Sequence, residues 1–236
     1  MNPSCVHAVA LNVEANPAKG FDSFSANSHT QTFALCDGAN SCAGSGLAAQ
    51  WLSVQMVNHQ GNQDLGSADS EDALAHINRR VFLAHQEMLT LHPETGSTLV
   101  YLSATSRGLN LASLGDSYLR LYQPGWGGVG KWGLIHETTR DINAQGNPTQ
   151  LIGSEVCNTL HTHRLPPKGT YIAVMLSDGP GLAMDAAYIG ARLSVLGRST
   201  PSDNDLQYLC LSLAKEALIR GCTDDTSVAI IWIRYK

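Results

Sequence analysis

Apolar and polar residues follow two different periods along this chain. Many short runs are apolar throughout or alternate with polar residues, and they stop at glycine, proline or small polar residues, which is typical of strands. Longer segments repeat apolar residues every three to four positions, as amphipathic helices do. The pattern predicts strands at 6–13, 22–26, 31–36, 97–105, 109–114, 117–122, 131–135, 171–176 and 228–233, and helices at 47–58, 70–89, 185–196 and 206–219.

The order of these elements indicates an α+β fold. Two strand-rich blocks each come with a pair of helices, which suits two packed sheets with helices on their outer faces. We therefore expect one domain, 1–236, forming a four-layer α-β-β-α sandwich of two antiparallel sheets flanked by helices. Tight turns separate the strands 97–105, 109–114 and 117–122, which predicts an antiparallel meander. The polar, weakly periodic segment at about 137–159 is expected to form a flap.

Composition and charge narrow the class of protein. The 236 residues are 43% hydrophobic, enough for a sizeable core, and the formal net charge is −5 without any run of Lys and Arg. This charge argues against a nucleic-acid partner. The six cysteines form no Cys-x-x-Cys pair, and the sequence shows neither a secretion leader nor an apolar run of membrane-spanning length. We therefore expect a cytoplasmic protein with no membrane partner.

Four acidic segments stand at the ends of predicted strands. Asp37, Asp116 and Asp178 come just after apolar strands, and Asp224 comes shortly before the last one. If these strands converge, like charges lie close together, which is costly in a low-dielectric setting unless a cation neutralises them. Carboxylates suit Mg²⁺ or Mn²⁺ rather than zinc, and Gly38 lets its backbone carbonyl approach the same ion. A single Asp-Gly pair is more often only a turn, but the four acids together predict a divalent metal site.

These residues, in this order, resemble the metal-dependent protein phosphatases of the PPM type, also called type 2C, and the bacterial members in particular. The resemblance covers nearly the whole chain, and it rests on the joint order and spacing of several short motifs. The matching motifs are Gly20–Phe24, Phe33–Gly38, Gly96–Thr98, Leu111–Ser117, Met175–Gly179 and Asp224–Val228.

The resemblance implies a catalytic role for three aspartates. Asp37 would bridge two metal ions, with the carbonyl of Gly38 on the second ion, and Asp178 and Asp224 would hold the first. Two adjacent cations can generate hydroxide at neutral pH and stabilise the incoming and leaving oxygens of an in-line displacement. That neutralisation of charge is the main catalytic need in phosphomonoester hydrolysis.

The same resemblance assigns two further acids and a function. Asp22 would lie near the second ion, directly or through water, and Asp116 would help to bind a third ion in addition to the first two. The implied protein is a monomeric serine/threonine phosphoprotein phosphatase of a signalling system. It would use Mn²⁺ or Mg²⁺ and a metal-bridged hydroxide to hydrolyse phosphomonoesters on a phosphorylated Ser/Thr protein.

The chain departs from the family's pattern where the substrate phosphate is held. The family usually carries an Arg a few residues before its first acidic motif, and here the nearest cation is Lys19, a point charge without bidentate geometry. Phe21 stands where the family often has Glu, and Ala39 stands where some members have His. Two alternatives therefore stay open: a phosphatase-like binding or regulatory domain without activity, and a phosphomonoesterase for small metabolites.

Two other features invite a chemical interpretation. His161 and His163 alternate as on one face of a strand, and two imidazoles at this spacing can bind a metal. No third soft ligand is near them in the sequence, so an exposed strand face is expected instead. Cys36 lies within an apolar strand beside Asp37, and we expect a buried residue rather than a reactive thiolate.

Overall fold

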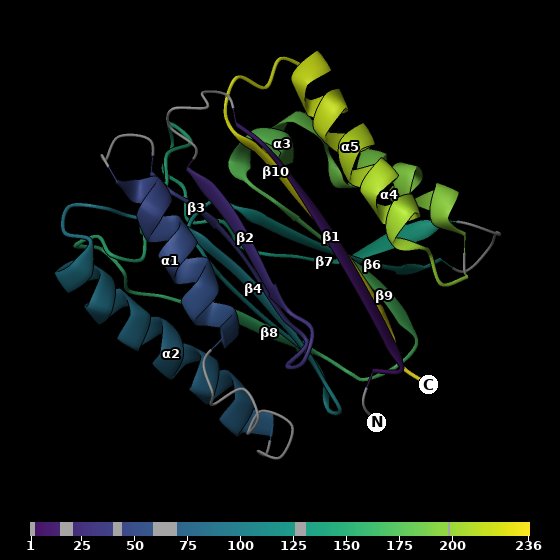
Figure 1. Ribbon diagram of the computed structural model, residues 1–236, viewed down its shortest axis with the longest axis horizontal. Coiled ribbons are helices and arrows are strands. Elements are labelled where there is room, and N and C mark those ends of the chain that lie inside the picture. The colour runs from purple at the N-terminus through teal and green to yellow at the C-terminus, as the bar shows by residue number, and fades with distance from the viewer. Residues whose placement is uncertain (1–2, 15–20, 40–43, 59–69, 126–130, 198) are drawn as a thin grey trace.

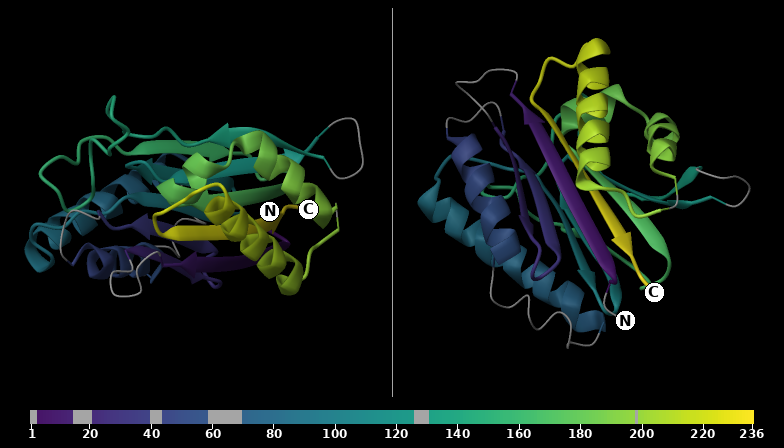
Figure 2. Two further views of the ribbon diagram at one scale, coloured as in Figure 1. Left: turned by 90° about the horizontal axis from the view of Figure 1, so that it is seen from above. Right: turned by 45° about the vertical axis from the view of Figure 1, so that its right-hand side comes forward.

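The computed structural model describes residues 3–14, 21–39, 44–58, 70–125, 131–197 and 199–236. Two five-stranded antiparallel sheets pack face to face, and helices cover both outer faces (Figures 1 and 2). This arrangement confirms the predicted four-layer α+β sandwich. No helix in the described part of the chain is both long and apolar enough to cross a membrane.

Each sheet is assembled from strands that are distant in the sequence. The first sheet has the order β1 (Cys5–Val13), β10 (Thr226–Arg234), β9 (Thr170–Leu176), β6 (Tyr118–Pro124) and β7 (Trp132–Glu137). The second has the order β2 (Asp22–Asn27), β3 (Thr32–Asp37), β4 (Leu99–Thr105), β5 (Gly108–Leu114) and β8 (His161–Leu165). Acidic residues therefore stand at strand ends in both sheets.

The helices divide between the two outer faces. On the second sheet lie α1 (Ser45–Asn58) and α2 (Ser70–Leu91), and on the first lie α3 (Asp178–Ala183), α4 (Ala186–Leu193), the short 3₁₀ helix η2 (Ser194–Leu196) and α5 (Asp203–Ile219). The sequence predicted no helix directly after Asp178. A helix of six residues is too short to show a helical period. In addition, Pro180 is a residue that usually ends helices, but it lies in the first turn of α3, where its missing N–H is not needed for an intrahelical hydrogen bond.

Side-chain alternation sorts the central strands between two cores. In β3, Phe33 and Leu35 pack between the sheets, whereas Ala34 and Cys36 are buried beneath the helices of the second sheet. Cys36 is thus a core residue, as expected from the sequence. Because successive side chains point to opposite faces of a strand, Asp37 continues the inter-sheet row of Phe33 and Leu35. The layer between the sheets is therefore apolar along its length and becomes acidic at one end.

The acidic end lies away from the chain termini. β1 pairs with β10 from Cys5 opposite Arg234 to Val13 opposite Thr226. Both termini therefore lie at one end of the sandwich, and the acids that precede β10 lie at the other (Figure 1). In β2 and β3, Asp22 stands opposite Asp37 at that same end.

The meander prediction is wrong for its third strand. β4 and β5 pair as a hairpin, but β6 pairs with β9 and β7 in the other sheet. The Gly115-Asp116 segment therefore crosses between sheets rather than turning back within one. The sequence could not show whether β6 pairs with β5 or joins the other sheet. Because β5 is buried on both faces and β6 nearly so, neither strand has an exposed polar face that would indicate its sheet. This crossing carries Asp116 to the acidic end of the sandwich.

Candidate metal centre

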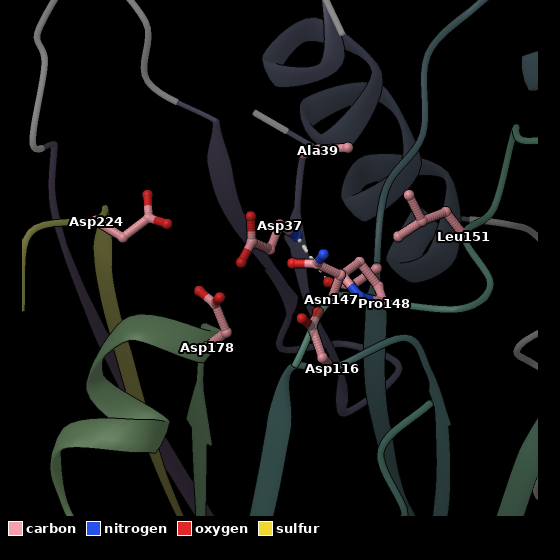
Figure 3. A pocket seen from close by; sticks show the side chains of 10 residues that line it. Asp37, Ala39, Asp116, Asn147, Pro148, Leu151, Asp178 and Asp224 are labelled. Carbon is pink, nitrogen blue, oxygen red and sulfur yellow. Dashed lines mark hydrogen bonds between the residues drawn. The ribbon is translucent and has the colours of Figure 1, made fainter. Parts of the chain in front are cut away.

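A pocket of about 490 Å³ opens at the acidic end, between the ends of strands from both sheets (Figure 3). Four of the aspartates predicted as ligands lie around it. Its lining consists of Asp37, Gly38, Ala39, Thr98, Asp116, Asn147, Pro148, Leu151, Asp178 and Asp224. In Figure 3 the carboxylates of Asp37, Asp178 and Asp224 extend into one shared space.

Asp37 is held by its backbone. Its N–H donates to the hydroxyl of Thr98 at 3.1 Å, and its carbonyl accepts from the Thr98 N–H at 2.8 Å. Gly38 is required for a further reason that the sequence did not reveal. A Cβ at this position would stand 2.5 Å from the carbonyl oxygen of Ser45, so only glycine lets β3 pass so close to the start of α1. These contacts leave the Asp37 side chain free to face the pocket.

Asp178 and Asp224 reach the pocket from the first sheet. Asp178 is the first residue of α3, directly after β9, and Asp224 precedes β10. The two strand ends are joined by Ser177, whose N–H donates to Ser227 O at 3.2 Å and whose hydroxyl accepts from Ser227 N at 3.1 Å. Gly179 permits this arrangement because a Cβ there would lie 2.7 Å from the Cys222 sulfur.

Asp116 is positioned by the segment that follows β7. The N–H of Gly115 donates to Asp141 Oδ2 at 2.9 Å, and the N–H of Asp141 donates to Gly115 O at 2.8 Å. Asp141 also contacts His161, with 2.7 Å between Oδ1 and the imidazole Nε2. The same segment then folds over the pocket, where Asn147 and Pro148 form part of its wall. These residues belong to the predicted flap, and its motion stays a prediction.

Asp22 differs from the other acids. It lines a neighbouring cavity of about 490 Å³, together with Asn12 and Ser227, rather than the pocket itself. Both its carboxylate oxygens are buried and have no hydrogen bond of good geometry within the described part of the chain. Burial raises its pKa to about 6, although the nearby hydroxyls of Ser177 and Ser227 oppose this rise. Its charge also raises the pKa of Asp37.

The carboxylates disfavour one another's charge. Burial raises the pKa of Asp37 well above its ordinary value, and the charges of Asp22 and Asp178 raise it further. The pKa of Asp178 is raised by burial and then by Asp224, and that of Asp116 is raised to about 6 by burial and then by Asp178. Asp22, Asp37, Asp116 and Asp178 make no ion pair with Lys or Arg within the described residues. The cluster therefore carries negative charge that these residues do not neutralise.

The donor set fits a hard divalent cation. All the donors are oxygens, and a bound cation would satisfy the buried oxygens of Asp22 beside Asp37 directly or through water. Among the described residues, no three His, Cys, Asp or Glu side chains already stand at ligand spacing around one point. The acids thus line an open pocket rather than a closed cage. Lys19, the sequence's candidate for holding phosphate, lies outside the described residues.

Two residues that line the pocket, Asn147 and Pro148, were not predicted from the sequence. Their only signal in the sequence was their place in the polar segment after β7.

The histidines of β7 and β8 lie outside this pocket. His163 stacks on His136 with 4.1 Å between ring centroids, joining β8 to β7 across the open edge of the sandwich. With His161 they line a separate pocket of about 230 Å³ that contains none of the predicted ligands.

Comparison with solved structures decides the fold. The Mycobacterium smegmatis PPM Ser-Thr phosphatase MsPP, in complex with cacodylate, matches with a TM-score of 0.68 over 100% of both chains at 17% identity. The chain has the fold of the PPM phosphatases. Stp1, a serine/threonine phosphatase from Staphylococcus aureus, matches this PPM fold with a TM-score of 0.71 at 15% identity, over 100% of this chain and 97% of Stp1.

A third match is the catalytic domain of the phosphatase PstP in complex with two manganese ions. Its TM-score is 0.68 at 21% identity, over 97% of this chain and 98% of that domain. No protein-family model matches the sequence, and no curated protein matches it. At these identities the PPM likeness is a likeness of fold, and any activity must be argued from the pocket itself.

Proposed function

We propose that this chain is a metal-dependent phosphatase that hydrolyses phosphoserine and phosphothreonine in proteins. One observation carries the proposal: aspartates from both sheets of a PPM fold border one open pocket, and three of them, Asp37, Asp116 and Asp178, make no ion pair with a described Lys or Arg. The phosphatases of the same fold support the choice of reaction, and the two manganese ions in the PstP complex support the choice of cofactor.

Four of the five acids have a part in this proposal. Two bound divalent ions would supply a hydroxide nucleophile at neutral pH and neutralise the charge of the phosphoryl group. Asp37 would be shared between the ions, with the Gly38 carbonyl beside it, and Asp178 and Asp224 would hold one ion from the opposite sheet. Asp22, in its neighbouring cavity, would act on the ions through Asp37 or a bound water.

The shape of the pocket supports a protein substrate. The pocket opens to solvent between loops, and Asn147, Pro148 and Leu151 form one wall beside the acids. A phosphorylated side chain that projects from a peptide could reach the acids through this opening. Comparing turnover of phosphopeptides with turnover of sugar and nucleotide phosphates distinguishes this substrate class from small metabolites.

The test is hydrolysis of a phosphothreonine peptide by the purified protein, measured with and without Mn²⁺. We expect activity that needs the metal and that falls on the order of 100-fold or more in Asp37→Asn and Asp178→Asn, since each loses a proposed ligand. Glu87→Gln removes one charge from an exposed position on α2 and serves as the matched control. Absence of turnover in wild-type protein with excess Mn²⁺, or equal turnover in all four proteins, contradicts the proposal.

One observation favours a second candidate, a PPM-like domain that binds a partner without catalysis. The described lining of the pocket contains neither Lys nor Arg, so no lining side chain matches the phosphate-holding Arg of the family. This candidate predicts that phosphopeptide binds to the metal-loaded protein without turnover. The hydrolysis assay above separates the two, because turnover lost in Asp37→Asn excludes the non-catalytic alternative.

A further inference from the structure

The pocket is short of positive charge for a phosphate ligand. Its described lining holds four aspartates and no basic residue. A phosphomonoester at neutral pH carries close to two negative charges, so ions that only balance the aspartates would leave the substrate's charge uncompensated. A cation beside the pocket is therefore needed, and Arg140 on the segment after β7 is suited to this place.

The backbone around Arg140 is tied to the site. Its neighbour Asp141 makes two hydrogen bonds with Gly115, one in each direction, at 2.8 and 2.9 Å. Gly115 directly precedes Asp116, whose side chain lines the pocket. Arg140 is therefore held next to the crossing that carries Asp116, and a few residues later the same segment contributes Asn147 to the pocket wall.

The guanidinium of Arg140 rests on a rigid surface. Its central carbon lies 4.6 Å from the centre of the Tyr118 ring, which is buried at the start of β6. The guanidinium of Arg120 also stacks on this ring, at 4.7 Å. Arg120 is buried and donates to Glu137 and to the carbonyl oxygens of Met184 and Gly181, so its task is structural.

Arg140 is only half-buried, and its charge reaches the pocket. It lies between acids from both sheets: Asp141 beside it is bonded to Gly115, which precedes Asp116, and the Tyr118 ring beneath it packs against Gly181 of α3, the helix that begins at Asp178. Within the described part of the chain, no hydrogen bond or ion pair involves its guanidinium. Its five N–H donors are thus available to a ligand, and their planar geometry matches two oxygens of a phosphate.

We propose that Arg140, stacked on Tyr118 at the edge of the acidic pocket, binds the phosphoryl group of the substrate. The inference rests on the proposed phosphatase function and names the residue that would replace the family's missing Arg. Arg140 then binds phosphate rather than metal, and its removal affects the affinity for phosphate-bearing ligands while the metal ions still bind.

The experiment compares wild type with Arg140→Ala and Arg140→Lys in two assays. Calorimetry measures orthophosphate binding to the Mn²⁺-loaded protein, and steady-state kinetics measures KM and kcat for a phosphothreonine peptide. A charge-assisted bidentate contact is worth enough that we expect Arg140→Ala to weaken phosphate binding and raise KM about 10- to 100-fold. Arg140→Lys keeps the charge but not the planar, bidentate geometry of the guanidinium. We expect its phosphate affinity and its KM to lie between those of wild type and Arg140→Ala.

Two controls keep the result interpretable. Arg79→Ala removes the same charge from an exposed position on α2 and is expected to match wild type. The rise in melting temperature on adding Mn²⁺ is expected to be the same in wild type and Arg140→Ala, which shows that folding and metal binding are intact.

The outcomes separate this inference from the proposed function. Phosphate affinity and KM unchanged in Arg140→Ala overturn the role of Arg140, as does a loss that comes with a lost response to Mn²⁺, since that would make the residue structural. If wild type binds orthophosphate through Arg140 but shows no turnover, the proposed function fails and the phosphate site stands. If wild type with Mn²⁺ binds no orthophosphate, the inference fails.

Discussion

Asp116 carries a charge that the metal-free fold disfavours. The residue is 5% exposed, and burial together with Asp178 raises its pKa to about 6 from an ordinary value of 3.8. The folded protein therefore holds this proton more tightly than the unfolded chain does. The stabilisation is complete below about pH 4 and is lost as the pH rises through about 6. At neutral pH the ionised side chain costs about 3 kcal/mol relative to a neutral one.

We therefore predict that Asp116→Asn stabilises the protein in EDTA at about pH 7.5 and much less at about pH 4.5. Asparagine has nearly the same shape and no charge, so it avoids the cost only where aspartate is ionised. The expected rise in melting temperature at the higher pH is about 6–12 °C. Thermal unfolding followed by circular dichroism measures it. Equal melting temperatures at the higher pH would show that the charge of Asp116 costs the fold nothing.

The sequence predicted the acids of the pocket better than the rest of its lining. Asp37, Asp116, Asp178 and Asp224 were recognisable because each adjoins an apolar run that positions it at a strand end. Asn147 was not, because its place depends on a loop that contacts the site through backbone bonds distant in the sequence. Such contacts leave no period or composition for sequence analysis to detect.

At the scale of elements, α3 holds Asp178 by close packing against β6. Gly181 lies against the Tyr118 ring, where an added Cβ would stand only 2.0 Å from the ring carbon Cδ2. The carbonyl of the same glycine accepts from Arg120 at 3.2 Å. Asp178 begins this helix, so the angle at which α3 docks also orients a proposed ligand.

Gly181→Ala is expected to destabilise the protein by about 1–3 kcal/mol, because the new methyl group must push α3 or the Tyr118 ring aside. Gly133→Ala, on β7, is the matched control, since a Cβ there meets nothing within 4 Å. Urea denaturation of both variants measures the difference. We also expect weaker Mn²⁺ binding in Gly181→Ala alone. Equal stability of the two variants would contradict the proposed docking contact.

The sequence predicted which elements exist better than how they pair. Strands and long helices have a period that local residues display, and the α+β class follows from their order. The pairing of β6 with β9 depends on which sheet Gly115-Asp116 leads into, and both answers bury the same apolar residues. Only the geometry of the crossing, with Gly115 at a φ of +93° against Thr98, distinguishes them.

At the scale of the whole molecule, the pocket exists only when the two sheets are packed together. Asp37 belongs to the second sheet, whereas Asp178 and Asp224 extend from the first. The apolar layer between the sheets thus brings like charges together at its end, at a cost that bound cations would offset. A ligand that binds only this packed state also stabilises it, so metal binding and sandwich packing support each other.

The most direct test of this account is the location of Mn²⁺ in crystals of the protein soaked with manganese, from anomalous scattering at the manganese edge. We expect strong peaks between Asp37 and the pair Asp178 and Asp224, and loss of those peaks in Asp37→Asn. Ordered manganese found only elsewhere, or none beside Asp37 in well-ordered crystals at saturating metal, would contradict it.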